Sequence, residues 1–210
     1  MLKEYMTVGK CGVYETVEKK SRFIATVCHV TTPEEAQNFI NSVKNDYIGA
    51  SHTVYAYSTE QPVFMQKYYD DGEPGGTAGL PVMEAIKKNR LTNICVTVTR
   101  YFGGILLGAS GLVRAYGKSA YKGIEAAGVV KMTPHIPVGI TVEYGDYGKI
   151  ENYINVNGLT KEETAFKSDV EIDLILPEEK TEYIAIQLTE LTSGRILITK
   201  KAAVYRAVNL

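Results

Sequence analysis

Residues 93–128 read NICVTVTRYFGGILLGASGLVRAYGKSAYKGIEAAG. The first seven of these residues are rich in β-branched side chains, a composition typical of a strand. Three glycines then follow within a short segment after Arg100, and the helical pattern beyond them ends at Gly128, a residue type common just past a helix terminus. The stretch therefore predicts a strand, a glycine-rich turn and a long helix, the kind of unit found in α+β proteins.

Upstream of this unit the sequence predicts alternating strands and helices. Residues 12–30 indicate two strands around a polar turn at 18–21. Thr32, Pro33 and Glu35 form the pattern of an N-cap, a first-turn proline and a capping box, and so predict the start of a helix. Strands are expected at 52–58 and within 62–69, and Pro81 requires the next helix to begin near residue 79 or 80.

Downstream, Pro134 and Pro137 bracket a change of pattern, and we expect a linker there. The predicted domains are residues 1–134 and 135–210. The second of them reads strand 138–144, helix 147–156, strand 159–166, strand 170–176, helix 178–192 and strand 196–205. This β-α-β-β-α-β order predicts a ferredoxin-like domain, a four-stranded antiparallel sheet with two helices on one face.

Composition limits the classes of protein to consider. The chain has 210 residues, of which 45% are hydrophobic and 22% charged, values that exclude a disordered protein. No segment approaches the roughly 18 apolar residues of a membrane span, and the N-terminal segment lacks the apolar core of a secretion signal. Residues 1–134 carry 15 Lys and Arg against 12 Asp and Glu (net +3), whereas residues 135–210 carry 8 against 12 (net −4). A polyanionic partner is therefore to be sought on the first domain.

The three cysteines, Cys11, Cys28 and Cys95, form no C-x-x-C pair and stand in apolar surroundings. Such cysteines usually behave as small buried hydrophobic residues. We therefore expect separate thiols in a reduced, cytoplasmic protein, with no structural metal site.

Residues 70–81, DDGEPGGTAGLP, combine three carboxylates with several glycines. One interpretation is a solvated turn. Another is a magnesium site in a hydrolase or transferase acting on a phosphorylated substrate, with Asp70, Asp71 and Glu73 as ligands and His52 as the base. A third interpretation uses the backbone amides of 75–77, next to a helix N-terminus, as donors to an anion.

The turn after residue 100 is a second candidate site. An arginine beside an aromatic residue, Arg100 and Tyr101, can hold a phosphate and stack on a base, although a structural arginine that satisfies loop carbonyls is equally compatible. In the helix that follows, Arg114, Lys118 and Lys122 recur at every fourth position and predict a cationic stripe. A solvated helix face is the alternative, because Glu125 lies nearby.

Two motifs together resemble the YigZ/IMPACT family. One is the Arg-aromatic-aromatic-Gly-Gly motif that begins at Arg100, and the other is the Glu-Pro-Gly-Gly-Thr-Ala-Gly motif that begins at Glu73. The resemblance implies a first domain like the second domain of the small-subunit ribosomal protein five superfamily, a mixed sheet packed by helices, and a ferredoxin-like second domain. The eukaryotic relative is a translational regulator that competes for the activator of a stress kinase. Leu80 departs from the family, since many bacterial members carry Lys or Arg there, and this weakens an RNA site at the loop.

We therefore expect a non-enzymatic, translation-associated regulator that binds RNA or the ribosome through its first domain, with no cofactor, metal or catalytic residue assigned. The metal-dependent enzyme and a pure protein-interaction module are the alternatives. Glu73 and Arg100 are expected to lie close together, with the two loops forming one surface. The candidate binding residues are His52, Glu73, Gly75, Gly76, Thr77, Arg100, Tyr101, Gly103, Gly104, Arg114, Lys118 and Lys122.

Overall fold

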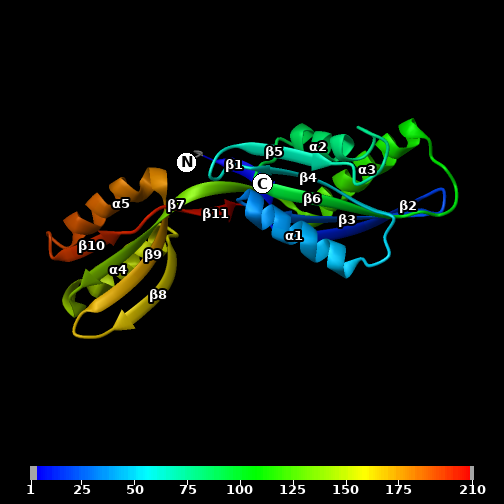
Figure 1. Cartoon of the computed structure of the whole chain (residues 1–210). Helices are drawn as coiled ribbons and strands as arrows, with labels where there is room; N and C mark the ends of the chain where they lie inside the picture. The colour runs from blue at the N-terminus through cyan, green and yellow to red at the C-terminus, as the bar shows by residue number, and fades with distance from the viewer. Residues whose placement is uncertain (1–3, 209–210) are drawn as a thin grey trace. The chain divides into compact units, whose positions relative to one another are not determined.

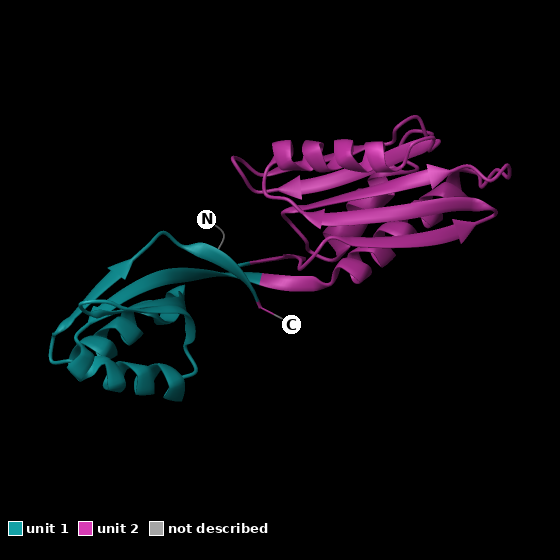
Figure 2. Ribbon diagram, turned by 90° about the horizontal axis from the view of Figure 1, so that it is seen from below, with its two compact units in different colours: residues 1–4, 132–207 teal, residues 5–131, 208–210 magenta. Residues whose placement is uncertain are grey.

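The computed structural model describes residues 4–208 and divides the chain into two compact units (Figure 2). Residues 5–131 make up the larger unit and residues 132–207 the smaller one. The division falls inside one strand, since β7 spans Val129–Val142.

The larger unit contains a five-stranded sheet and three helices (Figure 1). Its elements are β1 (Tyr5–Val8), β2 (Gly12–Glu18), β3 (Ser21–His29), α1 (Pro33–Asp46), β4 (His52–Thr59), β5 (Met65–Tyr69), α2 (Gly79–Lys88), β6 (Ile94–Tyr101), α3 (Ala109–Ala127) and the start of β7. The sheet has the order β2-β3-β6-β4-β5, and every neighbouring pair is antiparallel. The expected mixed sheet is therefore wrong, because each strand enters the sheet through a hairpin or a crossover that reverses its direction.

Helices cover both faces of this sheet. Alternate residues of a strand point to opposite faces, and on β4 Val54 packs in the cluster that α2 and α3 complete, whereas Tyr55 packs in the cluster of α1. Phe23 and Tyr116 meet edge to face in the α3 cluster, with ring centroids 5.1 Å apart. The central strands β3, β4 and β6 are thus largely buried on both faces, whereas the edge strands β2 and β5 are mostly exposed.

Local signals in the sequence fix the helix ends. The Thr32 side chain accepts a hydrogen bond from the Glu35 amide at 3.2 Å, and Pro33 is the first residue of α1, as predicted. The Glu35 carboxylate also accepts from the backbone amide and hydroxyl of Thr31. Helix α2 begins at Gly79, so that Pro81 stands in the first turn as expected.

The smaller unit is formed by the rest of β7, α4 (Tyr144–Val156), β8 (Thr160–Phe166), β9 (Val170–Pro177), α5 (Glu178–Leu191), β10 (Ile196–Lys200) and most of β11 (Val204–Val208). Its strands pair antiparallel in the order β10-β7-β9-β8, and β11 also pairs with β7. The predicted order β-α-β-β-α-β is confirmed. Alternate residues of β7 and β9, together with Ile150, Ile154 and Leu188 of the two helices, form its core.

Two details of this region differ from the sequence prediction. The expected linker at 129–137 belongs to β7, in which Pro137 lies opposite Ile175 and its carbonyl accepts from the Lys201 amide at 2.9 Å. Proline blocks amide donation but permits extended backbone, so the two prolines did not end the strand. The predicted last strand is interrupted at residues 201–203 and forms β10 and β11.

The expectation of three separate thiols is also wrong, because Cys11 and Cys28 form a disulfide. The antiparallel register of β2 and β3 pairs Gly12 with Val27 and so brings the two cysteines opposite each other. Cys95 is a buried free cysteine, and burial raises the pKa of its thiol well above the usual value. One ground for expecting a reduced, cytoplasmic protein is thereby removed. Among the described residues, no helix is both long and apolar enough to span a membrane.

Candidate functional site

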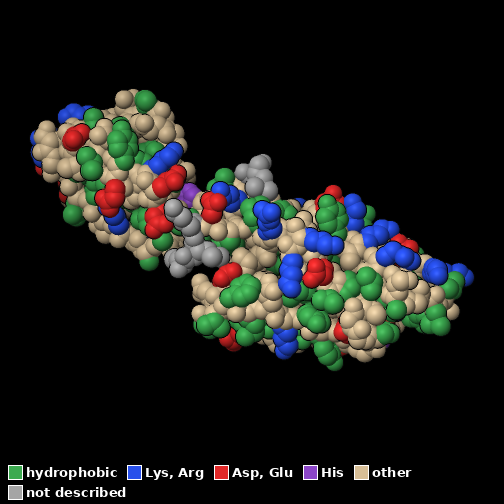
Figure 3. Space-filling view, turned by 90° about the horizontal axis from the view of Figure 1, so that it is seen from above, with side chains coloured by type: hydrophobic (Ala, Val, Ile, Leu, Met, Phe, Trp, Pro, Cys, Tyr) green, Lys and Arg blue, Asp and Glu red, His purple; other side chains and the backbone are tan. Residues whose placement is uncertain are grey.

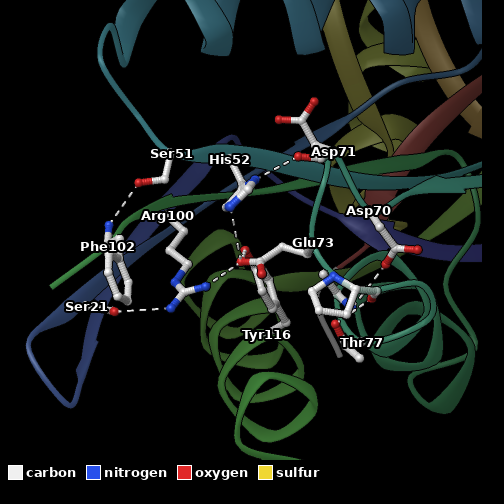
Figure 4. Close-up of polar contacts among 12 residues, drawn as sticks. Ser21, Ser51, His52, Asp70, Asp71, Glu73, Thr77, Arg100, Phe102 and Tyr116 are labelled. Atoms are coloured by element: carbon white, nitrogen blue, oxygen red, sulfur yellow. Dashed lines mark hydrogen bonds and ion pairs between the residues drawn. The ribbon is translucent and has the colours of Figure 1, made fainter. Parts of the chain in front are cut away.

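A buried ion pair joins the two motifs that the sequence singled out (Figure 4). Nη1 of Arg100, at the end of β6, lies 2.6 Å from Oε1 of Glu73, in the loop before α2. Only 6% and 4% of the two side chains are exposed. The hydroxyl of Tyr116, from the middle of α3, donates to the same carboxylate oxygen at 2.7 Å. The prediction that Glu73 and Arg100 lie close together is therefore confirmed.

Aromatic rings hold the guanidinium group in place. Its central carbon lies 5.4 Å from the ring centroid of Phe23 and 5.3 Å from that of Phe102, distances typical of cation–π contacts. Nη2 of Arg100 lies 3.4 Å from the hydroxyl of Ser21, and its Nε is buried without a partner in the described chain. Arg100 is consequently largely buried and its charge is already balanced by Glu73, which does not favour the expected role of a phosphate clamp.

Tyr116 remains a hydrogen-bond donor at any ordinary pH. Burial, and then the hydrogen bond to Glu73, raise the pKa of its hydroxyl well above the usual value. Because Tyr116 stays protonated, its hydroxyl and Arg100 together supply two donors to one oxygen of Glu73. Sequence reasoning missed this residue. Its only signal was a tyrosine on the apolar face of the predicted helix.

His52 completes the cluster from β4, where it lies opposite Arg100 of β6. Its Nδ1 is 2.7 Å from the carbonyl oxygen of Asp71, and its Nε2 is 3.9 Å from Oε1 of Glu73. A carbonyl oxygen only accepts hydrogen bonds, so Nδ1 carries a proton and Nε2 is the nitrogen that faces Glu73; in the neutral form of this tautomer Nε2 is an acceptor. His52 was predicted as a candidate without a partner, and the structure places it beside Asp71 and Glu73.

In the acidic loop, the carboxylate of Asp70 occupies the backbone amides that an external anion would need. The Asp70 carboxylate accepts hydrogen bonds from the backbone amides of Gly76, Ala78 and Gly79 at 2.9, 3.1 and 2.8 Å. The Thr77 amide is occupied as well, by the carbonyl of Pro74 at 3.0 Å. The amides of Gly76 and Thr77, expected to bind an external anion, are therefore already used inside the loop.

The three carboxylates of this loop face different partners. Asp71 accepts from the Thr53 amide at 2.6 Å and lies 3.4 Å from Lys44, while Asp70 and Glu73 are engaged as described above. No group of three potential metal ligands occurs among the described residues. The predicted magnesium site, with Asp70, Asp71 and Glu73 as shared ligands, is therefore wrong. Neighbouring residues of an extended loop point in opposite directions, so these carboxylates do not converge on one point.

The glycine turn after β6 is tied to the β2–β3 hairpin. A Cβ atom on Gly103 would lie 2.1 Å from the backbone of Lys20, so only glycine fits. The Gly103 amide donates to Ser21 Oγ at 3.2 Å, while Gly104 has a φ of +81°. This turn therefore positions Arg100 and Phe102 by close packing, which explains its first glycine without any ligand.

The remaining predicted residues are spread over the surface. The ring of Tyr101 lies against Arg22, whose guanidinium carbon is 5.3 Å from the ring centroid. Lys118 pairs with Glu18 at 2.7 Å, and Lys122 pairs with Glu125 at 2.6 Å. Arg114 and Lys118 line a common hollow, whereas Lys122 is not among the residues of that hollow. The stripe is thus partly neutralised, and only its first two members act together.

A cavity of about 480 Å³ lies over the ion pair. His52, Glu73 and Arg100 contribute its polar wall, and Phe102, Leu106 and Leu112 are among its apolar lining. Phe102 is 48% exposed and Leu106 81% exposed, so the cavity opens to solvent beside apolar side chains. A few convergent polar groups in an otherwise apolar cavity are typical of a binding site.

These features define a two-part protein whose signature motifs meet at one buried ion pair, and the chain belongs to the IMPACT family. Residues 19–124 match the Impact N-terminal domain, and residues 140–195 match a domain of unknown function, DUF1949.

The bacterial relatives cover most or all of the chain, and the human relative covers less than half of it. The IMPACT family member YvyE of Bacillus subtilis is 41% identical and covers 100% of this chain and 97% of its own. The IMPACT family member YigZ of Escherichia coli is 31% identical over 85% of this chain and 88% of its own. A crystal structure of a hypothetical protein superimposes with a TM-score of 0.62 and 27% identity, covering 94% of this chain and 97% of that one. Human Protein IMPACT is 31% identical over 43% of this chain and 29% of its own.

Proposed function

We propose that this protein is a translation-associated, cytoplasmic RNA-binding protein that holds RNA or the ribosome through a cationic rim on its larger unit. The rim consists of Lys19, Lys20, Arg114 and Lys118. The single observation that carries the proposal is a hollow of about 300 Å³ whose lining includes Lys19, Arg114 and Lys118. Figure 3 shows Lys and Arg side chains following one another along one edge of this unit.

The cations of the rim have the exposure that phosphate contacts need. Lys19 and Lys20 are exposed at the tip of the β2–β3 hairpin. Lys118 is 58% exposed despite its pairing with Glu18, and such surface pairs are worth only about 0–1 kcal/mol. A phosphate can replace Glu18 at little cost, so Lys118 remains available.

The exposed ring of Phe102 adds a stacking surface beside the rim, a role that the sequence assigned to Tyr101. Bases stack on aromatic rings with little dependence on sequence. Gly103 connects the two regions, because its backbone packs on that of Lys20. The link to translation rests on the resemblance to the family's eukaryotic regulator, and few cations predict a modest, salt-sensitive affinity.

The test measures binding of structured and single-stranded RNA at several salt concentrations. Lys118→Glu should weaken binding to all RNAs and reduce the slope of log affinity against log salt by about 0.7–0.9 for the lost contact. Lys167→Glu is the matched control, since Lys167 is 61% exposed and pairs with Glu171 at the same 2.7 Å. Equal losses in both variants, or none in either, would contradict the proposal.

A specific observation also favours a second candidate, a protein-interaction module. Phe102, Ile105 and Leu106 are 48%, 42% and 81% exposed within one turn, and together they offer apolar area to a partner. A pulldown from lysate with and without ribonuclease separates the two functions. Partners that survive ribonuclease and are lost in Leu106→Asp support the second candidate, whereas partners that disappear with RNA support the first.

A further inference from the structure

The cavity over the ion pair presents two hydrogen-bond acceptors that no described residue satisfies. Oε1 of Glu73 accepts from Arg100 and Tyr116, whereas its Oε2 receives no hydrogen bond in the described part of the chain. Nε2 of His52 is the acceptor of the neutral ring, because Nδ1 faces the Asp71 carbonyl at 2.7 Å. Glu73 lines the cavity and keeps one carboxylate oxygen for a ligand, so the cavity favours a ligand with N–H donors.

Arg100 supplies the opposite chemistry beside these acceptors. Of the five N–H groups of a guanidinium, two donate, to Glu73 and Ser21, and three are unused among the described residues. Glu73 neutralises the charge of Arg100, so the cavity has no strong preference for a charged ligand. It instead fits a neutral group that carries one acceptor and two donors along one edge.

The shape and walls of the cavity indicate a flat, apolar body behind that edge. Phe102 stacks one face of its ring on Arg100, with the guanidinium carbon 5.3 Å from the ring centroid, and it is 48% exposed. Leu106 and Leu112 add apolar surface, and a volume of about 480 Å³ accommodates a planar heterocycle. Extruded bases are recognised in this way, by stacking on an aromatic ring and hydrogen bonds to the base edge.

We propose that this cavity binds the guanine base of a single-stranded RNA, an inference that rests on the proposed RNA-binding function. Arg100 donates to O6, Glu73 Oε2 accepts from N1–H, and His52 Nε2 accepts from the 2-amino group. Arg100 and His52 both approach Glu73, with Arg100 Nη1 and His52 Nε2 lying 2.6 and 3.9 Å from Glu73 Oε1, so the three groups are close enough to contact one base edge (Figure 4).

The other bases match this pattern less well. Adenine and cytosine place a ring-nitrogen acceptor in the middle of the edge, against the Glu73 carboxylate. Uracil has a central N–H but flanks it with two carbonyl oxygens, one of which would face the His52 acceptor. Guanine satisfies all three groups.

The experiment measures fluorescence anisotropy of labelled oligouridylates of about eight nucleotides, a length within the usual single-strand site size. The central nucleotide is guanosine, adenosine, cytidine, uridine or inosine, which lacks the 2-amino group. We expect guanosine to bind about tenfold more tightly than the other three standard bases, since it alone satisfies all three groups. Inosine should be intermediate.

Variants separate this inference from the proposed function. His52→Ala should abolish the difference between guanosine and inosine, whereas His29→Ala, a change at the opposite end of the β3–β6 pairing, should preserve it. Lys118→Glu should weaken the binding of every oligonucleotide by the same factor. Binding without a preference for guanosine overturns this inference and leaves the rim as the RNA site, whereas no binding to any oligonucleotide overturns both.

Discussion

The ion pair between Arg100 and Glu73 allows a quantitative test of what holds the larger unit together. The perturbation is a double-mutant cycle made of Arg100→Met, Glu73→Leu and the double variant, with replacement side chains of similar size and no charge. Each single change leaves one ionised group in a site where only 6% or 4% of the side chain is exposed. The double variant leaves no charge behind.

The structure gives the expected magnitudes. Removing one partner of a buried pair costs about 3–5 kcal/mol, whereas replacing both with apolar groups is often close to neutral. The Tyr116 hydroxyl loses its acceptor in the double variant, and an unsatisfied buried donor costs about 1–3 kcal/mol. We therefore expect the double variant to be destabilised by about 1–3 kcal/mol, far less than the roughly 6–10 kcal/mol obtained by adding the two single changes.

Urea unfolding followed by pulsed hydrogen exchange on β6 peptides is the assay, because it reports the larger unit separately. With a urea m-value of about 2 kcal/mol/M, each single variant should lower the midpoint by about 1.5–2.5 M. The exposed Lys118–Glu18 pair is the control, and its cycle should give a coupling of at most about 1 kcal/mol. Additivity of Arg100→Met and Glu73→Leu within about 0.5 kcal/mol would refute the reasoning.

Three further predictions concern stability. Gly103→Ala should destabilise the larger unit by about 1–3 kcal/mol in urea unfolding, because the added Cβ would overlap the Lys20 backbone. Its control is Gly148→Ala in α4, where the added Cβ meets open space; this change should stabilise the smaller unit by up to about 1 kcal/mol. The raised pKa of Tyr116 predicts a contribution to stability that is complete below the unfolded value of about 10 and is lost as pH rises above it. Tyr116→Phe should make the loss of stability at alkaline pH less steep in unfolding curves, and an unchanged slope would contradict this. Burial lowers the pKa of His29, against the opposing effect of Glu35, so the contribution of His29 to stability is present above about pH 6.5 and is lost as pH falls below it. His29→Gln should therefore flatten the dependence of unfolding free energy on pH between neutral and mildly acidic pH. A dependence unchanged by the substitution would show that His29 is not its cause.

Much of the fold could be predicted because its signals are local. The cap of α1 depends on Thr32, Pro33 and Glu35, which are neighbours in sequence, and the start of α2 follows from the single constraint on Pro81. β7 shows the limit of such reasoning. Pro134 and Pro137 resemble a linker in sequence, but pairing with β9 keeps this segment extended.

Of the contacts in the candidate site, the sequence predicted the one that follows from opposite charges. Arg100 and Glu73 were expected to meet because two loops of opposite charge needed partners. The role of Tyr116 could not be predicted, because it depends on the position of α3 against the sheet. The Cys11–Cys28 disulfide likewise depends on strand register, which separation along the chain conceals.

The hydrogen bonds of Asp70 affect how experiments on this family are to be interpreted. Its carboxylate is tethered within nine residues of the three amides that it binds, so its effective concentration there greatly exceeds that of any free phosphate in the cell. Asp70 belongs to the motif that most resembles an acidic catalytic centre. A loss of function after Asp70→Ala would therefore report the collapse of a turn, whereas His52→Ala examines the cavity itself without leaving a buried charge unpaired.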